Sequence, residues 1–257
     1  GEVGAESRGL DDALALGVQP GLDAAAARAL PGRDQRIRGG VVGLLRLARD
    51  LLGHLRRQQL ARRRAGLGST VAGAIFGGAI YGLMLWLWEH RVMTIPWSWW
   101  AWVLCFVLDD LLYYLFHRSA HRVRWFWASH VNHHSSQHYN LSTALRQTWT
   151  GFFALSFAFR IWPAFIGFDP AMIVMVGAVN LVYQFWIHTE AIGRMPRWFE
   201  AVMNTPSHHR VHHATNPVYL DRNYAGVFII WDRLFGSFQR ERDDEVIHYG
   251  IVRQLGT

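Results

Sequence analysis

The sequence predicts an all-α integral membrane protein with about four spans arranged as two helical hairpins, and three observations support this. Hydrophobic residues make up 51% of the 257-residue chain and gather in four apolar runs. Tryptophans cluster near the ends of these runs, where membrane proteins place interfacial anchors. Arginines lie mainly outside the runs. We therefore divide the chain into an Arg-, Ala- and Gly-rich extension over 1–68, a membrane domain over 69–250 and a tail over 251–257.

The first hairpin is predicted from two apolar runs joined by a short link. Thr70–Trp88 is almost uninterrupted apolar sequence, and Trp97–Phe116 is apolar apart from Asp109 and Asp110. Each run is close to the ~20 residues that cross ~30 Å of hydrocarbon as a helix. Because the link is short, the two helices are expected to be antiparallel neighbours.

The second hairpin is predicted from Thr148–Phe168 and Pro170–Ile187, which are separated by a single residue, Asp169. Two spans are one interpretation of this pair. The alternative is that both segments enter the membrane and return without crossing it.

The arginines predict the orientation in the membrane. With two hairpins, the extension, the segment between the hairpins and the region after the fourth run lie on one side, and that side carries most of the arginines. Positively charged flanks face the cytoplasm, so we expect the N-terminus there. For residues 1–68 a surface helix over 39–60 and a poorly ordered extension are both open. The net charge is +7, but the arginines form no stripe interleaved with aromatic residues. Membrane headgroups rather than nucleic acid are therefore the expected anionic partner.

Ten of the 14 histidines form clusters on this same predicted side. These residues are His117, His121, His130, His133, His134, His188, His208, His209, His212 and His213. Spacings of three and four residues place side chains on one face of a helix, so a short helix can supply several metal ligands. The lone Cys105 offers no thiolate site. We therefore predict a cytoplasmic helical cap that carries a histidine-rich dimetal site.

The number of histidines indicates two ions rather than one. A mononuclear site needs three or four protein ligands, and imidazole suits Zn, Fe, Cu and Ni. His208 is less certain than its neighbour, because the spacing His209-x-x-His212-His213 repeats His130-x-x-His133-His134 and leaves His208 as an extra residue.

Three polar residues inside the apolar runs are further candidates for the site. Asp110 precedes His117 and His121 by seven and eleven residues, which favours a role behind the ligands; pairing with an arginine such as Arg146 is the structural alternative. Asn180 and Gln184 form a polar stripe that continues to His188. This stripe predicts a substrate cavity, and interhelical hydrogen bonding is the alternative. The catalytic-site prediction therefore includes Asp110, Asn180 and Gln184.

The histidine pattern resembles the fatty acid hydroxylase / sterol desaturase superfamily, and within it the alkylglycerol monooxygenase-like membrane di-iron proteins. The matching words are DLLYYLFHRSAH, HVNHHSSQHYNLSTALRQ, YQFWIHTE, NTPSHHRVHH and NYAGVFIIWDRLFGSF, and the likeness covers residues 70–250. It implies that the eight histidines of the three multi-histidine motifs bind metal, with His188 and His208 as additions.

The same resemblance implies an enzyme that activates O₂ and attacks a C–H bond of a lipid. The implied cofactors are two iron ions, with zinc as an alternative occupant in a purified form, and an external electron donor such as tetrahydrobiopterin. For an ether lipid, hydroxylation beside the ether oxygen would give a hemiacetal that collapses to an aldehyde and glycerol. His138 stands where the animal enzymes often carry an acidic residue, which weakens the likeness to that branch.

Two other functions compete with an oxygenase. A zinc-dependent membrane hydrolase would need a carboxylate base beside the ligands, and Glu190 is the nearest one in the sequence. A non-catalytic membrane metal-binding protein or transporter would place polar residues through several runs, whereas Thr70–Trp88 and Thr148–Phe168 are nearly featureless.

Overall fold

A computed structural model describes residues 70, 72–146 and 151–252. The chain separates into two compact units, Gly1–Leu67 and Gly68–Thr257, and the described residues belong to the second. The predicted extension and its surface helix over 39–60 lie outside the described residues. The regular elements described are helices: Ala72–Glu89, α4 (Trp99–Arg122), α5 (Arg124–His134), α6 (Leu141–Ala144), η1 (Gly151–Ala154), α7 (Phe157–Arg160), α8 (Trp162–Ile166), α9 (Pro170–Trp186), α10 (Arg197–Val202), α11 (Pro206–His213) and α12 (Ile230–Leu234).

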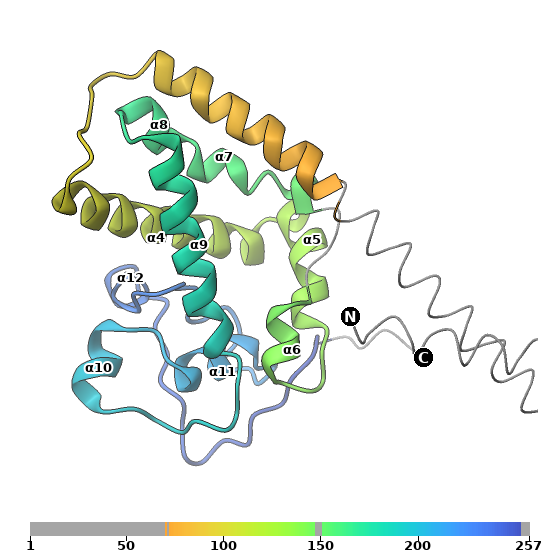
Figure 1. Cartoon of the computed structure of the whole chain (residues 1–257). Coiled ribbons are helices and arrows are strands. Elements are labelled where there is room, and N and C mark those ends of the chain that lie inside the picture. Colours follow the sequence, from red (N-terminus) through yellow and green to blue (C-terminus); the bar gives the residue numbers. More distant parts are fainter. Residues whose placement is uncertain (1–69, 71, 147–150, 253–257) are drawn as a thin grey trace, which may run out of the picture. The chain divides into compact units, whose positions relative to one another are not determined.

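The Ala72–Glu89 helix and α4 are long and apolar enough to cross a membrane, and they form the predicted first hairpin (Figure 1). Large apolar side chains such as Ile75 and Trp86 on the first helix and Val103 on α4 are exposed. A core helix of a soluble protein would bury such side chains, so these exposed surfaces fit contact with lipid. The second helix continues past the predicted end of its apolar run, and this extension carries His117 and His121.

The third predicted span is not a single helix in its described part, so the structure does not confirm four spans. Its described part is divided among η1, α7 and α8, and none of these exceeds five residues. Leu155 has φ 53°, a left-handed conformation that interrupts a helix. Pro163 lacks the N–H that a continuing helix would donate. The fourth predicted run does form one helix, α9, but its 17 residues make it a shorter apolar helix.

An apolar core joins the first hairpin to α8 and α9. Met84 and Leu87 pack there with residues of α4 and α9, such as Ala101 and Met172. At Gly167 (φ 135°) the chain turns from α8 into α9, and a Cβ at this position would lie 2.0 Å from the carbonyl oxygen of Met93. Only glycine fits both the conformation and this close approach.

The shorter helices gather at one end of this core (Figure 1). Figure 1 shows α4 and α9 crossing, with α10, α11 and α12 on the side of α4 that is opposite α8, and with α5 and α6 at the other side of α9 from α10 and α12. α5 follows α4 after the single extended residue Val123, so the two helices form a sharp corner. The histidine clusters lie on α4, α5 and α11 and just after α9, so this arrangement brings them to one end of the fold.

Candidate metal centre

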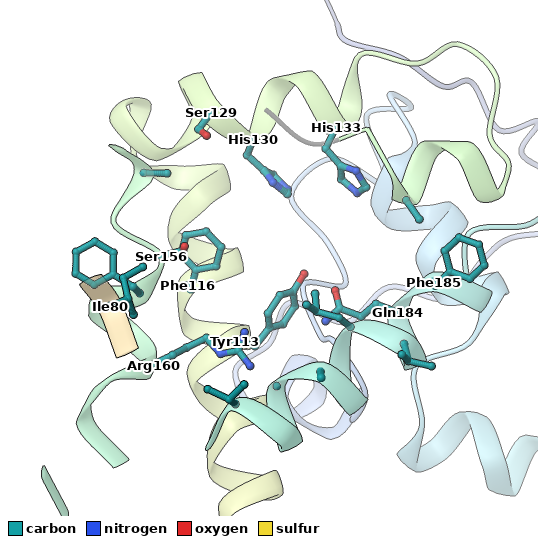
Figure 2. Close-up of a pocket in the computed structure, with 18 of the residues that line it drawn as sticks. Ile80, Tyr113, Phe116, Ser129, His130, His133, Ser156, Arg160, Gln184 and Phe185 are labelled. Carbon is teal, nitrogen blue, oxygen red and sulfur yellow. The ribbon is translucent and has the colours of Figure 1, made fainter. Parts of the chain in front are cut away.

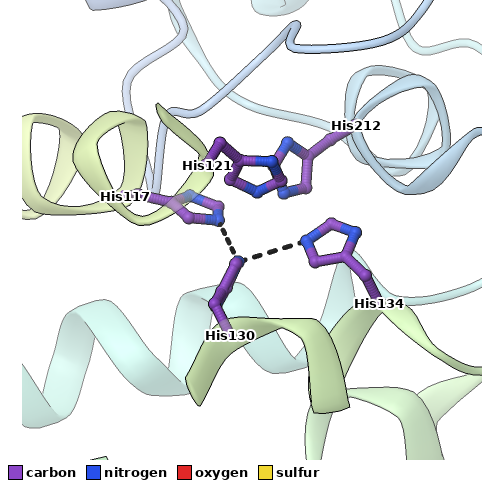
Figure 3. A group of neighbouring side chains, drawn as sticks. All are labelled: His117, His121, His130, His134 and His212. Atoms are coloured by element: carbon purple, nitrogen blue, oxygen red, sulfur yellow. Dashed lines mark hydrogen bonds between the residues drawn. The ribbon is translucent and has the colours of Figure 1, made fainter. Parts of the chain in front are cut away.

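Nine of the predicted ligands come together in two groups. The first histidine group contains His117, His121, His130, His134 and His212 (Figure 3), and the second histidine group contains His133, His188, His209 and His213. Within each group the candidate ligand nitrogens all lie within 4.8 Å of one another. As found among the described residues, both groups consist of histidine alone, so each presents only neutral nitrogen ligands.

Helical spacing explains why two helices each serve both groups. On α5 the pair four residues apart, His130 and His134, belongs to the first group, whereas His133 belongs to the second. On α11 His209 and His213, which are four residues apart, belong to the second group, whereas His212 belongs to the first. Residues four apart lie nearly in line along a helix, and a residue three along is rotated to the neighbouring line.

The nitrogen positions fit a shared metal ion. His130 Nε2 lies 2.9 Å from His117 Nε2 and 3.1 Å from His134 Nε2. In the second group His188 Nε2 lies 3.0 Å from His209 Nε2. A metal–imidazole bond of about 2.0–2.1 Å places two ligands at right angles with their nitrogens about 3 Å apart. The observed separations therefore suit ligands of one ion.

Unpartnered nitrogens support the same interpretation. Within the part of the chain that the structure describes, three buried ring nitrogens of the two groups have no hydrogen-bond partner: His121 Nε2, His212 Nε2 and His213 Nε2. Buried polar atoms nearly always have a partner, so these three are expected where a metal ion supplies the missing interaction. His133 Nδ1 and His209 Nδ1 are also unpartnered, but the Nε2 atoms of these rings are the ones that face His188 Nε2. His208 Nδ1 is unpartnered outside both groups.

Backbone carbonyls hold three of the rings by their other nitrogen. His117 Nδ1 donates to the carbonyl of Tyr224 at 2.7 Å. His212 Nδ1 donates to the carbonyl of Arg222 at 2.9 Å, and His188 Nδ1 to the carbonyl four residues before it at 2.7 Å. A carbonyl can only accept, so the proton is on Nδ1 and the Nε2 lone pair is available to a metal.

The two groups touch each other. The rings of His134 and His213, one from each group, stack with centroids 4.3 Å apart and an interplanar angle of 20°. His209 and His212 form a second stacked pair across the boundary, with centroids 5.1 Å apart. Ions held by the two groups would therefore be neighbours, as the predicted dimetal site requires.

Burial keeps the second histidine group in the form that binds a metal. Loss of hydration lowers the pKa of His133 to about 3 and the pKa of His188 to about 4. Burial, reinforced by neighbouring histidines, also holds the pKa of His209 and His213 well below the ordinary value of 6.5. These imidazoles are therefore neutral at physiological pH, as metal ligation requires.

These lowered pKa values predict that bound metal survives mild acid. Protons compete with metal for imidazole, and a lowered pKa means that the neutral ring persists as the pH falls through 6.5. We expect the purified protein to keep its metal down to about pH 5 and to release it nearer pH 4. Elemental analysis after dialysis at each pH measures this, with circular dichroism as a control for unfolding. Release that is half complete at pH 6 or above would contradict the prediction.

His208 lies outside both groups, although it was predicted as an additional ligand. Its Nε2 is 4.0 Å from Glu200 Oε2, and its ring meets the edge of Phe238 at a centroid distance of 5.4 Å. On α11 His208 immediately precedes a second-group ligand, so its side chain points about 100° away from that neighbour. We therefore leave His208 out of the proposed ligand set.

Asp110 acts on the site through a loop rather than through a histidine ring. Its fully buried carboxylate accepts hydrogen bonds from the backbone N–H of Val227 at 2.8 Å and of Phe228 at 2.9 Å. Trp231 Nε1 donates to the same carboxylate at 3.0 Å, and Asn180 Nδ2 donates to it at 3.1 Å. The predicted position directly behind the ligands is therefore corrected: Asp110 ties α4 to the loop whose carbonyls hold two ligand rings.

The arginine that pairs with these neighbouring aspartates is not the one that the sequence suggested. Asp109, not Asp110, forms an ion pair, and its partner is Arg160 on α7 rather than Arg146. Asn180 Nδ2 donates to the other carboxylate oxygen of Asp109 at 3.2 Å. Arg160 is the last residue of α7, so the ion pair lies where the third predicted run is interrupted between α7 and α8.

Gly226 gives a direct test of this packing. A Cβ at Gly226 would lie 2.8 Å from Asp110 Oδ1, 2.8 Å from Tyr113 Cδ1 and 2.9 Å from Asn180 Oδ1. We expect Gly226→Ala to lower the free energy of unfolding by about 1–3 kcal/mol, since these neighbours are held by their own bonds. Thermal unfolding in detergent measures this. Gly193→Ala is the matched control because a Cβ there meets no atom within 4 Å; equal losses in the two variants would refute the prediction.

A cavity of about 840 Å³ lies against both histidine groups (Figure 2). Its wall includes His130 of the first group and His133, His188 and His209 of the second. Most of the remaining wall is apolar and comes from the Ala72–Glu89 helix, α4, α5, α7 and α9. Gln184 lines the cavity as predicted, whereas Asn180 is buried behind it. This volume lies in the range of ligand pockets, roughly 300–1,000 Å³.

Sequence reasoning missed the residues that shape the ligand-holding loop. Asp232 is fully buried, and its carboxylate accepts from the backbone N–H of Tyr224 and of Ala225, each at 2.8 Å, and from Ser237 Oγ at 2.7 Å. Asp232 therefore positions the carbonyl that holds His117. The only signal was that these residues fall within the matching word NYAGVFIIWDRLFGSF, which indicated a likeness without a role.

Together these features define a helical protein with two adjacent all-histidine groups, each able to hold a metal ion, beside an apolar cavity. The chain belongs to the fatty acid hydroxylase family, whose model matches residues 102–237. This match begins near the start of α4 and ends just after α12, so it includes both histidine groups.

The chain is also similar to individual lipid-oxidising enzymes. The chain is 43% identical over 196 residues to alkylglycerol monooxygenase of Xenopus tropicalis and 41% identical over 202 residues to that of Homo sapiens. Each match covers 75% of this chain and 43% of the relative, so the chain spans less than half the length of these proteins. A cholesterol 25-hydroxylase-like protein of Danio rerio is 27% identical over 152 residues, covering 55% of this chain and 57% of that protein. No solved structure matches the chain.

Proposed function

We propose that this protein is a membrane-bound non-haem di-iron oxygenase that uses O₂ to hydroxylate a lipid chain, with an ether lipid as its substrate. One observation carries the proposal: the wall of the apolar cavity includes ligands from both histidine groups. A lipid chain bound in the cavity would have a carbon beside both ions.

The two histidine groups would hold one iron ion each. Family membership and nine clustered imidazoles support a redox metal centre. Iron supplies the redox chemistry that breaks a C–H bond, which zinc does not. Hydroxylation consumes one O₂, two electrons and two protons for each C–H bond and releases one water. An external reductant is therefore part of the proposal, and tetrahydrobiopterin is the first one to supply.

The chain's own residues would bind the substrate and exclude water. Phe116, Phe157, Ile173 and Leu181 are among the apolar side chains that line the cavity, and burying a lipid chain against them is favourable by about 25 cal/mol per Å². Two carbonyl-held rings, His117 and His188, would keep their Nε2 atoms aimed at the metals while the substrate moves. The similarity to the alkylglycerol monooxygenases of Xenopus tropicalis and Homo sapiens supports an alkylglycerol as the lipid.

The membrane would deliver the substrate. The first hairpin offers exposed apolar helices, and the metal centre lies beyond the end of α4 that carries His117 and His121. By the positive-inside rule, the Arg-rich flanks support a cytoplasmic position for this end and for the N-terminus. A lipid could then enter from the bilayer while O₂ and the reductant arrive from water.

Hydrolysis by zinc is supported less well. Such an enzyme needs a carboxylate to activate the attacking water, and the two histidine groups contain none among the described residues. Glu190 is exposed, and its Oε1 accepts a hydrogen bond from the hydroxyl of Tyr249 at 3.0 Å. A non-catalytic metal-binding role leaves the apolar cavity against the histidines without a purpose.

The test is oxygen incorporation by membranes that contain the full chain. Membranes from an expressing host are given 1-O-hexadecylglycerol, tetrahydrobiopterin and ¹⁸O₂, and the aldehyde and alcohol products are analysed by mass spectrometry. We expect a labelled product that is absent under argon. A product that forms equally without O₂ would contradict an oxygenase and favour the hydrolase.

Two variants separate the metal centre from background activity in these membranes. His133→Ala removes a ligand of the second histidine group and is expected to abolish the labelled product. His138→Ala is the matched control, since this exposed histidine lies outside both groups and outside the cavity wall. Equal activity in the two variants would refute the assignment of the histidines.

A further inference from the structure

Tyr113 places a hydroxyl group inside the apolar cavity close to the histidines. It lies on α4 one turn before His117, and the two rings are 5.3 Å apart between centroids. Tyr113 belongs to the cavity wall, and Figure 2 shows its hydroxyl pointing toward the side of the cavity where His130 and His133 lie. No described residue forms a hydrogen bond with this hydroxyl. A polar group in such a place is costly unless a ligand or water binds it.

Gln184 presents an oxygen to the same cavity, and the hydrogen bonds behind it determine that orientation. Both oxygens of Asp110 accept backbone N–H groups, so Asn180 must direct its NH₂ group toward that carboxylate. Asn180 Oδ1 therefore faces Gln184 and accepts from Gln184 Nε2 at 2.6 Å. The remaining Gln184 Oε1 is an acceptor, and Figure 2 shows it on the same side as the Tyr113 hydroxyl.

The other strongly polar group in the wall is already engaged. Arg160 lines the cavity, but its Nε and Nη2 both donate to Asp109 Oδ1. Its position is also confined, because Arg160 Nη2 lies only 2.5 Å from where a Cβ on Gly177 would be. Tyr113 and Gln184 thus offer a donor and an acceptor on the same side of the cavity.

We propose that Tyr113 and Gln184 determine substrate specificity by binding an oxygen-bearing group next to the carbon that is oxidised. The Tyr113 hydroxyl would donate to an ether or hydroxyl oxygen, and Gln184 Oε1 would accept from a hydroxyl. The ligand class is a lipid with an apolar chain and at least one hydroxyl close to the reacting carbon. This inference rests on the proposed function, because it names the class of lipid that the proposed oxygenase would bind in the cavity.

The pair also gives a physical basis for selectivity. A plain hydrocarbon would leave the Tyr113 hydroxyl and Gln184 Oε1 buried without partners, which disfavours its binding. Sites built to hydrogen-bond a substrate reject analogues that lack the polar group more strongly than apolar walls reject a different chain length. The apolar wall would therefore tolerate different chains, whereas the polar pair would require the oxygenated end.

A binding competition tests the inference without turnover. The full chain in nanodiscs is equilibrated anaerobically, without reductant, with radiolabelled 1-O-hexadecylglycerol, and octadecane competes as a probe of the apolar wall alone. Tyr113→Phe and Gln184→Met each remove one polar interaction while keeping most of the side-chain volume. We expect each to weaken binding of 1-O-hexadecylglycerol roughly threefold to tenfold and to leave octadecane within about twofold of wild type.

Tyr114→Phe is the matched control, since the hydroxyl of this neighbouring residue bonds to Ser237 Oγ at 2.8 Å and does not line the cavity. We expect it to bind both probes like wild type, with equal metal content in all variants. The inference is overturned if Tyr113→Phe binds 1-O-hexadecylglycerol as wild type does, or if it weakens both probes equally. Selective binding without any O₂-dependent product would sink the proposed function alone.

Discussion

Replacing His212 with alanine should empty the first histidine group and abolish lipid oxidation. His212 Nε2 is buried without a hydrogen-bond partner while Nδ1 is held by the Arg222 carbonyl, so this ring is prepared to bind a metal. Loss of groups that only orient ligands typically costs about 10–100-fold in metal affinity or activity, so loss of a ligand should cost at least ~100-fold. We expect metal content to fall from about two ions per chain to about one or fewer, measured by elemental analysis beside product formation.

His208→Gln is the control for this experiment, because His208 lies on the same helix but outside both histidine groups. Glutamine keeps a polar side chain near Glu200, which is the group that His208 approaches. This variant should keep the metal content of the wild-type protein. If it loses as much metal as His212→Ala, or if His212→Ala keeps its full metal content, the two-group description of the centre is wrong.

Replacing Asp110 with alanine should destabilise the protein more than any other single change outside the histidines. Three donors would lose their acceptor, namely two backbone N–H groups and the Trp231 indole, and the Asn180 amide would keep only its bond to Asp109. Each buried donor left unsatisfied costs about 1–3 kcal/mol, so we expect a loss of at least about 3 kcal/mol in the free energy of unfolding. Denaturant unfolding in detergent, followed by circular dichroism, measures it.

Two comparisons make this result specific. Asp110→Asn keeps the shape and one acceptor oxygen but places an NH₂ group among donors, so its loss should be smaller than that of the alanine variant. Asp243→Ala removes an exposed carboxylate that pairs with Arg194 at 2.9 Å and should cost no more than about 1 kcal/mol. A loss below 1 kcal/mol for Asp110→Ala would show that the loop holds its shape without this carboxylate.

The parts of the fold that could be predicted are those determined by local pattern. The first hairpin and α9 follow from apolar length. The broken third run could not be predicted from hydropathy. Its interruption occurs where Leu155 takes a left-handed conformation and where Arg160 reaches Asp109, a residue 51 positions away, and hydropathy reports neither feature.

The candidate site divides in the same way. The histidine spacings indicate several ligands on one face of a helix, and the structure brings nine of the ten predicted ligands together in two groups. They do not reveal which group each histidine joins, because that depends on how α5 and α11 face one another. The exclusion of His208 follows from its place near Glu200, a contact that the local pattern does not contain.

The sequence alone determined the class of this protein: apolar runs set the helices near the membrane, and residue type with helical period set the ligands, because both depend only on near neighbours. Tertiary structure decided the rest. It divides the histidines into two groups and brings the Asp110 carboxylate into hydrogen bonds with the backbone of Val227 and Phe228. It also places the side chains of Tyr113 and Gln184 in the wall of one cavity. These features arise from contacts between residues distant in sequence, whose geometry exists only after the helices have packed.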